Sequence, residues 1–128
     1  MVKEEHREES EKYLNKAEEF LTVANLAFKQ SLFNVAAFNA IQSTINANDA
    51  LTVFVLGKRA SIDHKEAMSM HIETVRKIQD ASMRSVLNEA LKSRSRVGYS
   101  GEIIKKDEAG KLIKSATLFL SWIKNYVK

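Results

Sequence analysis

Glycine and proline are scarce in this chain, and that scarcity constrains its fold more than any other feature. The 128 residues contain no Pro and only four Gly. Both residues mark the turns of β-rich folds, so a chain with so few of them favours long helices. The length suits one domain with its own hydrophobic core. We therefore expect a single all-α domain over residues 1–128, an up-and-down antiparallel four-helix bundle with one additional short helix.

The composition narrows the class of protein further. No Cys is present, so disulfides and thiolate metal ligands are ruled out. The first twelve residues are highly charged, so no secretory signal is expected, and no apolar run reaches the roughly 18 residues that span a bilayer. Phosphate-binding Gly motifs and helical His metal pairs are also missing. The sequence predicts a cytoplasmic protein without membrane contact, metal or cofactor.

Apolar residues recur at helical spacing along five segments. The predicted helices are Glu4–Lys29, Leu32–Leu56, His64–Ile78, Met83–Leu91 and Asp107–Tyr126. Gly57 is expected to end the second helix, and Ser61 or Asp63 to cap the third, with Glu66 as the capping-box partner of Asp63. Asp107 is expected to cap the fifth. The segment Ser93–Lys106 is then a long irregular loop, and such loops are often functional.

The second predicted helix is apolar on most sides but carries one polar strip. The strip consists of Asn39, Gln42, Ser43, Asn46 and Asp49, which share one face because they follow helical spacing. Buried amides and carboxylates need hydrogen-bond partners. The strip therefore forms either a polar cleft or a seam between subunits, unless it simply faces water. Asp49 is its sharpest member, because a charge in the middle of such a helix needs a partner.

Charge is distributed unevenly along the chain, whose formal net charge is +4. Residues 1–19 hold seven acids and four bases, whereas residues 76–114 hold ten bases and five acids. A basic second half suits an anionic partner such as RNA, DNA or an acidic protein. The alternative is an ordinary solvated helical surface, since exposed Lys and Arg are common.

Within the predicted loop, Arg94, Arg96 and Tyr99 form a candidate binding site with Gly98 and Gly101. The Arg side chains offer planar, forked donors for phosphate, and Tyr99 suits a contact with a base or a ribose. The Gly residues let the backbone approach a ligand. In the alternative interpretation, the bases offset a helix macrodipole and Tyr99 anchors the loop.

Two of the three histidines lie on the third predicted helix. His64 directly follows Asp63, and it is either a site residue or a capping contact, because one His alone defines no site. His71 lies two turns further on, about 10 Å along the axis, so the two cannot share one metal. No metal site is predicted.

The last predicted helix carries a second apolar line in addition to its core stripe. This line consists of Leu118, Trp122 and Tyr126. One helix of a small bundle rarely needs two such lines, so we expect one of them to meet a partner subunit. Together with the polar strip, the line predicts a homodimer, because a self-complementary patch is the commonest route to dimers.

Several segments resemble the HEPN family of small helical domains. The Ala-rich stretch Ala40–Leu51, the Gly57–Arg59 turn and the Asp63-His64 pair are similar to the family's second helix and the loop that follows it. The Arg94 to Gly101 segment and the final helix from Asp107 resemble its closing region. The resemblance covers most of the chain. It implies a four-helix up-and-down core, frequent homodimers, and links to RNA cleavage or to nucleotidyltransferase partners.

The chain departs from the family's nuclease motif, which is an Arg, four to six variable residues and then a His. Tyr99, Ser100 and Gly101 stand at that distance from Arg94, and no His follows Arg96 at that distance either. Metal-independent RNA cleavage needs a group that moves protons near neutral pH, and Tyr, with an ordinary pKa near 10, is a poor base.

The sequence therefore predicts a dimeric HEPN-like module that binds RNA, a nucleotide or a protein partner without ribonuclease activity. The predicted binding residues are Asn46, Asp49, His64, Arg94, Arg96 and Tyr99. Two alternatives stay open. One is a toxin-like ribonuclease that uses Arg94, Tyr99 and His64. The other is an antitoxin or adaptor that acts only through protein contacts.

Overall fold

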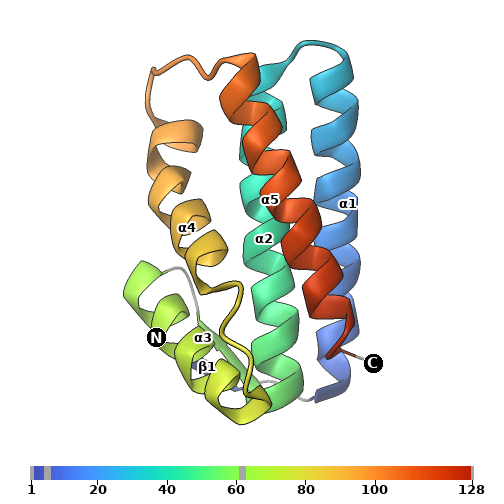
Figure 1. The fold of residues 1–128 in the computed structure, drawn as a ribbon, viewed down its shortest axis with the longest axis vertical. Helices are drawn as coiled ribbons and strands as arrows, with labels where there is room; N and C mark the ends of the chain where they lie inside the picture. The colour runs from blue at the N-terminus through green and yellow to red at the C-terminus, as the bar shows by residue number, and fades with distance from the viewer. Residues whose placement is uncertain (1, 5–6, 61–62, 128) are drawn as a thin grey trace.

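Five helices and one short pair of strands make up the described part of the chain (Figure 1). The computed structural model describes residues 2–4, 7–60 and 63–127. Its helices are α1 (Ser10–Lys29), α2 (Phe33–Leu56), α3 (His64–Ile78), α4 (Arg84–Tyr99) and α5 (Lys106–Lys124). In Figure 1, α1, α2, α4 and α5 alternate in direction, and α3 lies tilted beside the lower end of α4. The all-α bundle is confirmed, and α3 is the helix that stands outside the up-and-down set.

The N-terminal segment differs from the predicted helix. Strand β1 (Val2–Glu4) pairs antiparallel with β2 (Lys58–Ala60), so that Val2 lies opposite Ala60, and a 3₁₀ turn, η1 (Arg7–Glu9), leads into α1. The helix therefore starts at Ser10 instead of Glu4. Local periodicity gave no sign of this pairing, because the partner strand is more than 50 residues away. The proposed alternative cap, Ser61, lies outside the described residues.

Small side chains line the seam between α1 and α2. Ala17 and Ala24 on α1 and Ala36, Ala40 and Ala47 on α2 are all buried. Small residues at a helix contact let the two helix axes approach closely. The Ser43 hydroxyl crosses the seam and donates to the backbone oxygen of Ala17 at 2.7 Å. The seam is thus lined by small side chains and bridged by one buried hydrogen bond.

The caps around α3 agree with the prediction. Gly57 follows α2 in the left-handed region at φ 71°, a conformation that Gly adopts without steric cost. The Asp63 carboxylate accepts from the backbone N–H groups of Lys65 (2.8 Å) and Glu66 (3.2 Å), which makes it the cap of α3. The break that follows α3, between Ile78 and Arg84, is also where it was expected.

The boundaries of the last two helices were predicted wrongly. Helix α4 continues to Tyr99, so the first half of the expected loop Ser93–Lys106 is helical. Val97 is buried in the same core cluster as Ala90, two turns earlier on α4, and this packing overrides the weak helix propensity of Ser and Gly. At Gly98, an added Cβ would lie only 2.5 Å from the Phe38 ring, so this close contact needs Gly. Helix α5 is preceded by Lys105 and has no side-chain cap, so Asp107 is not its cap.

The second apolar line of α5 is largely covered within the chain. Trp122 is 7% exposed, and its indole N–H donates to Asp80 Oδ2 at 2.8 Å. The Tyr126 hydroxyl donates to the same oxygen. Only Leu118 is exposed, at 51%. Trp122 and Tyr126 therefore hold the α3–α4 turn against α5. The sequence predicted that this line meets a partner subunit, but these two side chains are covered by the chain itself.

Candidate functional site

A polar cleft lies where α2, the start of α3 and α4 meet. Asn48 and Asp49 reach it from α2, Asp63 from the cap of α3, and Arg94 from α4. Its apolar walls are Ile45, Ala60, Ala67, Leu87 and Leu91. The fold thus brings together two residues predicted for the site, Asp49 and Arg94, which lie 45 positions apart in the sequence and on different helices. Both are half-buried, and both interact with other groups of the protein.

The size of this cleft limits what can enter it. Its volume is about 10 Å³. A cavity of about 10–15 Å³ holds one water molecule, so a nucleobase cannot fit between these walls. The cleft can hold a water molecule or receive one oxygen atom of a ligand at its mouth. This rules out the interior of the cleft as an enclosed nucleotide pocket.

Asp63 joins the cleft to the start of α3. The N–H groups of Glu66 and Lys65 hydrogen-bond to its carboxylate and lower its pKa below the usual 3.8. The side chain therefore stays ionised at neutral pH. One carboxylate thus caps a helix and places a negative charge at the cleft, where the Arg94 guanidinium also lies.

His64 stands beside the cleft as the first residue of α3. Its Nε2 lies 3.1 Å from the side-chain oxygen of Asn88 on α4. The contact joins α3 to α4 one residue after the cleft-lining Asp63. The structure therefore places His64 next to the cleft that holds Arg94, although His64 does not line it.

A buried histidine, which the sequence did not indicate as a site residue, contacts the cleft-lining residue Asn48. His71 is 0% exposed, and its Nδ1 lies 2.9 Å from the Asn48 side-chain oxygen. Since that oxygen accepts, Nδ1 carries the hydrogen, and Nε2 has no hydrogen-bond partner in the part of the chain that the structure describes. Burial, together with the positive charge of Arg84, lowers the His71 pKa from 6.5 to about 4. No local sequence pattern links His71 to Asn48, because the two residues lie 23 positions apart on different helices.

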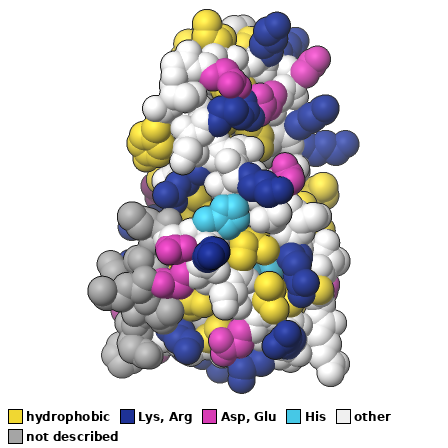
Figure 2. Space-filling view, turned by 90° about the vertical axis from the view of Figure 1, so that its left-hand side faces the viewer, with side chains coloured by type: hydrophobic (Ala, Val, Ile, Leu, Met, Phe, Trp, Pro, Cys, Tyr) yellow, Lys and Arg dark blue, Asp and Glu magenta, His cyan; other side chains and the backbone are white. Residues whose placement is uncertain are grey.

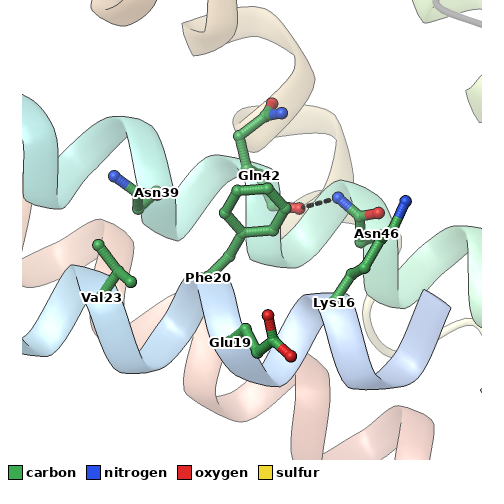
Figure 3. A pocket seen from close by; sticks show the side chains of 7 residues that line it. All are labelled: Lys16, Glu19, Phe20, Val23, Asn39, Gln42 and Asn46. Carbon is green, nitrogen blue, oxygen red and sulfur yellow. Dashed lines mark hydrogen bonds between the residues drawn. The ribbon is translucent and has the colours of Figure 1, made fainter. Parts of the chain in front are cut away.

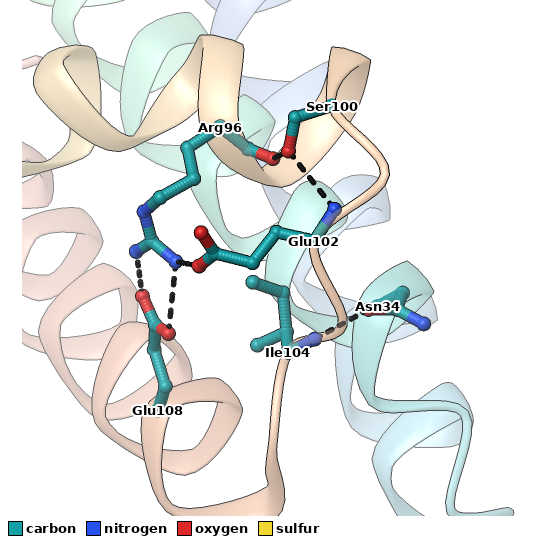
Figure 4. Close-up of polar contacts among 6 residues, drawn as sticks. All are labelled: Asn34, Arg96, Ser100, Glu102, Ile104 and Glu108. Carbon is teal, nitrogen blue, oxygen red and sulfur yellow. Dashed lines mark hydrogen bonds and ion pairs between the residues drawn. The ribbon is translucent and has the colours of Figure 1, made fainter.

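Arg96 does not join Arg94. Two positions on a helix are separated by about 200°, so these side chains leave α4 in nearly opposite directions. The Arg96 guanidinium pairs with the carboxylates of Glu108 and Glu102 (Figure 4), which raise its pKa. The residues after α4 are also fixed: the N–H of Ile104 donates to the Asn34 side chain at 2.7 Å. The expected flexible, doubly Arg-bearing loop is therefore a helix end held by ion pairs.

Tyr99 and Asn46 lie away from the cleft as well. Tyr99 ends α4, is 75% exposed, and meets the Phe38 ring edge-on with centroids 6.1 Å apart. Asn46 donates to the backbone oxygen of Gln42 at 2.9 Å and lines a groove between α1 and α2. The predicted polar strip is divided: Asn39, Gln42 and Asn46 face this groove, Ser43 enters the seam, and Asp49 enters the cleft.

Basic side chains are frequent on the face formed by α3 and α4. Helix α4 carries four bases, Arg84, Lys92, Arg94 and Arg96, and one acid, Glu89. Figure 2 shows Lys and Arg side chains spread over this face, with fewer Asp and Glu among them and a His near its centre. Arg84 and Lys92 are exposed, whereas Arg94 reaches inward to the cleft. The helix that contributes Arg94 to the cleft thus carries a surplus of positive charge.

The described residues contain no group of three His, Asp or Glu side chains arranged to hold a metal ion. Among the described helices, none is both long and apolar enough to cross a membrane.

Comparison with known proteins identifies one family. A search of curated proteins found no match. The family model for the HEPN domain matches residues 10–126, which include all five helices and the cleft residues Asp49 and Arg94. The match covers nearly the whole chain, and the observed bundle agrees with the expected fold. The protein belongs to the HEPN domain family.

Proposed function

We propose that this protein is a HEPN module that binds RNA across the face of α3 and α4 and does not cleave it. The observation that carries the proposal is the position of Arg94, which lines a cleft at the edge of the base-rich helix α4. Phosphate contacts with Lys and Arg supply most of the affinity for nucleic acid that is independent of sequence. Exposed Arg84 and Lys92 supply such contacts on this face.

The dimensions of the cleft favour a polynucleotide over a free nucleotide. With room for about one water molecule, the cleft cannot enclose a base. A phosphodiester backbone needs no enclosed pocket, because it is bound from outside by exposed cations and by groups at the mouth of a cleft. RNA is therefore the ligand that fits both the charge of the face and the narrowness of the cleft.

The positions around Arg94 argue against cleavage. Tyr99, which stands at a distance where the family's nuclease motif has His, projects from the end of α4 and packs against Phe38. Proton transfer requires an acid or base within hydrogen-bond reach of the reacting atoms. Tyr99 does not lie beside the Arg94 cleft, so the motif lacks its proton-transfer group.

Binding to single-stranded RNA over a range of salt concentrations tests the proposal, with fluorescence anisotropy as the readout. We expect affinity to fall steeply with salt, and the double variant Arg84→Ala, Lys92→Ala to flatten the slope of log K against log salt by about 1–2 units. Arg96→Ala is the matched control, because Glu108 and Glu102 already neutralise this Arg on the same helix. An unchanged slope in the double variant, or an equal loss in the control, would overturn the proposal.

A ribonuclease is the second candidate, and the position of His64 favours it. His64 follows Asp63 at the cleft, and its Nε2 contacts Asn88 on the helix that carries Arg94. An imidazole there suits proton transfer near neutral pH. The same RNA, analysed on a denaturing gel after incubation, decides between the candidates. We expect intact RNA, whereas cleavage that disappears in both His64→Ala and Arg94→Ala would establish the nuclease.

A further inference from the structure

Exposed apolar side chains gather at one end of the bundle. They lie on the second half of α1, the α1–α2 turn, the start of α2, the end of α4 and the α4–α5 connection, which meet at the upper end in Figure 1. Of the seven large hydrophobic residues exposed in the described part of the chain, these are six: Val23, Leu26, Leu32, Val35, Tyr99 and Ile103. Single exposed apolar residues are ordinary, whereas a group of them marks an interaction surface. We call this group the apolar end.

Contacts between distant segments join these residues into one surface. The Tyr99 ring meets the Phe38 ring edge-on with centroids 6.1 Å apart, and Phe38 follows Val35 by one helical turn. The backbone N–H of the residue after Ile103 donates to the Asn34 side chain at 2.7 Å (Figure 4). Ile103, which is 76% exposed, therefore lies beside the start of α2.

Val23 marks the lower edge of the apolar end. It stands six residues before Lys29, the last residue of α1, which corresponds to about 9 Å along the helix axis. It also lines the groove between α1 and α2 (Figure 3). Further from the end, polar side chains line the same groove, among them Glu19, Gln42 and Asn46. The apolar side chains thus occupy a shallow layer, and polar groups follow below it.

Basic side chains flank the apolar end. The exposed bases are Lys29, Lys105 and Lys106. None of them forms an ion pair within the part of the chain that the structure describes. Of the acids at this end, Glu102 and Glu108 pair with Arg96, and Asp107 remains. The end is therefore apolar at its centre and positively charged at its rim.

We propose that the apolar end lies on a membrane surface that contains anionic lipids. Such a surface offers both complements of this end, because its headgroups attract Lys and its interior accepts apolar side chains. Proteins that lie on a bilayer insert their apolar face by about 5–10 Å, which matches the depth set by Val23. Tyr99 combines an apolar ring with a polar hydroxyl, and such side chains are enriched at the membrane–water boundary.

The sequence predicted no membrane contact, because no apolar run is long enough to span a bilayer. A protein that lies on the surface needs no spanning segment. Its apolar residues are dispersed along the sequence and come together only in the fold. Contact with a membrane surface therefore leaves no continuous apolar run in the sequence.

The shape and chemistry of the end favour a membrane over a protein or a nucleic acid. Leu32 and Ile103 stand on two connecting segments at the tip of the bundle. A partner helix docks in a hydrophobic groove, whereas side chains at a tip can enter a deformable lipid surface. RNA is disfavoured here, because aliphatic side chains offer bases no stacking surface. The proposed RNA contacts of Arg84 and Lys92 lie outside the apolar end, so this inference does not depend on them.

Flotation with lipid vesicles tests the apolar contribution. We expect the wild type to bind vesicles of phosphatidylcholine with about 30% phosphatidylserine, and to bind phosphatidylcholine alone more weakly. Leu32→Ser should lower the affinity for the anionic vesicles by about tenfold, and adding Ile103→Ser should lower it further. Leu118→Ser is the matched control, because Leu118 is 51% exposed, as against 54% for Leu32, but lies about 18 Å along α5 from its start. Helical circular dichroism shows that each variant is folded.

A second pair of variants tests the basic rim. Lys105→Gln combined with Lys106→Gln should lower the affinity for the anionic vesicles by about fivefold for each charge removed. Lys65→Gln combined with Lys77→Gln removes two exposed charges from α3, at the other end of the bundle, and should have little effect. An equal loss in this control would mean that only the net charge of the protein matters, which contradicts the proposal.

A fluorescent label reports whether the apolar end enters the lipid. The natural chain has no Cys, so Ile103→Cys can carry a single environment-sensitive fluorophore. We expect its emission to shift to the blue on anionic vesicles, and the emission from Leu118→Cys to stay unchanged. A wild-type chain that floats with neither vesicle overturns the proposal and leaves the apolar end for a protein partner. Binding without the blue shift, or binding equally sensitive to Leu118→Ser, overturns it too.

Discussion

The α1–α2 side and the α3–α4 side of this bundle are built from different chemistry. The seam of α1 and α2 consists of buried Ala residues with one hydroxyl bond, and its outer groove carries neutral amides. The cleft of α2, α3 and α4 contains carboxylates and a guanidinium, and a buried imidazole lies below it. Burying charged or titratable groups is expensive unless other groups compensate. The difference shows that the α1–α2 side is built for packing. The α3–α4 side, in contrast, retains polar groups that packing alone does not require.

The largest expected effect concerns the buried imidazole and the pH dependence of stability. The unfolded chain protonates His71 near pH 6.5, whereas the folded protein keeps it neutral down to about pH 4. Between these values the unfolded state binds more protons, so stability is full above about pH 6.5 and falls as the pH drops. We expect a loss of about 3 kcal/mol across this window. Urea unfolding at a series of pH values measures it.

His71→Gln sharpens this test, because an amide does not titrate in that range. The variant should be less stable at pH 7 but should have a flatter profile between pH 4 and 6.5. Asp63 and Asp80 have lowered pKa values, so their contributions to stability are lost below about pH 4. They therefore do not contribute to the change expected between pH 4 and 6.5. Parallel profiles for the variant and the wild type would show that His71 is not the group responsible.

The next prediction compares the stability effects of two residues of the polar strip, Asp49 in the cleft and Asn46 in the α1–α2 groove. Asp49→Ala removes a half-buried carboxylate from the cleft and leaves polar groups there without their partner, so we expect it to cost about 1–3 kcal/mol. Asn46→Ala, at the open groove, should change the free energy of unfolding by less than about 0.5 kcal/mol. Chemical denaturation of both variants at neutral pH measures the difference. Equal costs would abolish the distinction between cleft and groove.

The last effect, at the end of α4, is also expected to be small, although Arg96 pairs with two carboxylates. Its side chain is 37% exposed, and solvent-exposed ion pairs contribute about 0–1 kcal/mol. Arg96→Ala should therefore lower the midpoint of unfolding only slightly, and high salt should reduce the difference further. A loss above about 2 kcal/mol would mean that the end of α4 depends on this pair as strongly as the core depends on packing.

The sequence predicted the helices better than it predicted the contacts between them. Local signals placed the end of α2 at Gly57 and the cap of α3 at Asp63, because both depend on neighbouring residues. The start of α1 and the end of α4 were missed, because each depends on a partner far along the chain, β2 for the first segment and Phe38 for Gly98. Packing and pairing of this kind override local propensity.

The candidate site shows the same limit. Asp49 and Arg94 were chosen for their chemistry, and the fold places them in one cleft. Arg96 and Tyr99 were grouped with Arg94 because they are close in sequence, but helical geometry directs them elsewhere. The His71–Asn48 pair joins residues 23 positions apart, so the pairing could not be predicted from the residues around either one. On a helix, residues that are close in sequence face the same way only when their spacing matches the helical repeat, as at three- and four-residue steps.

The link from Asp80 to Trp122 and Tyr126 has a consequence for the order in which the protein folds during synthesis. Trp122 and Tyr126 lie 42 and 46 positions after Asp80 in the sequence, whereas α1 and α2 form a hairpin of neighbouring helices. Distant contacts close late, because chain entropy must be overcome first and because α5 is translated after the other four helices. The α1–α2 hairpin can therefore assemble while the ribosome is still translating α5. The turn between α3 and α4 is locked only when the final helix has emerged, so a stalled ribosome would hold a chain with its packing side formed and its polar side unfinished.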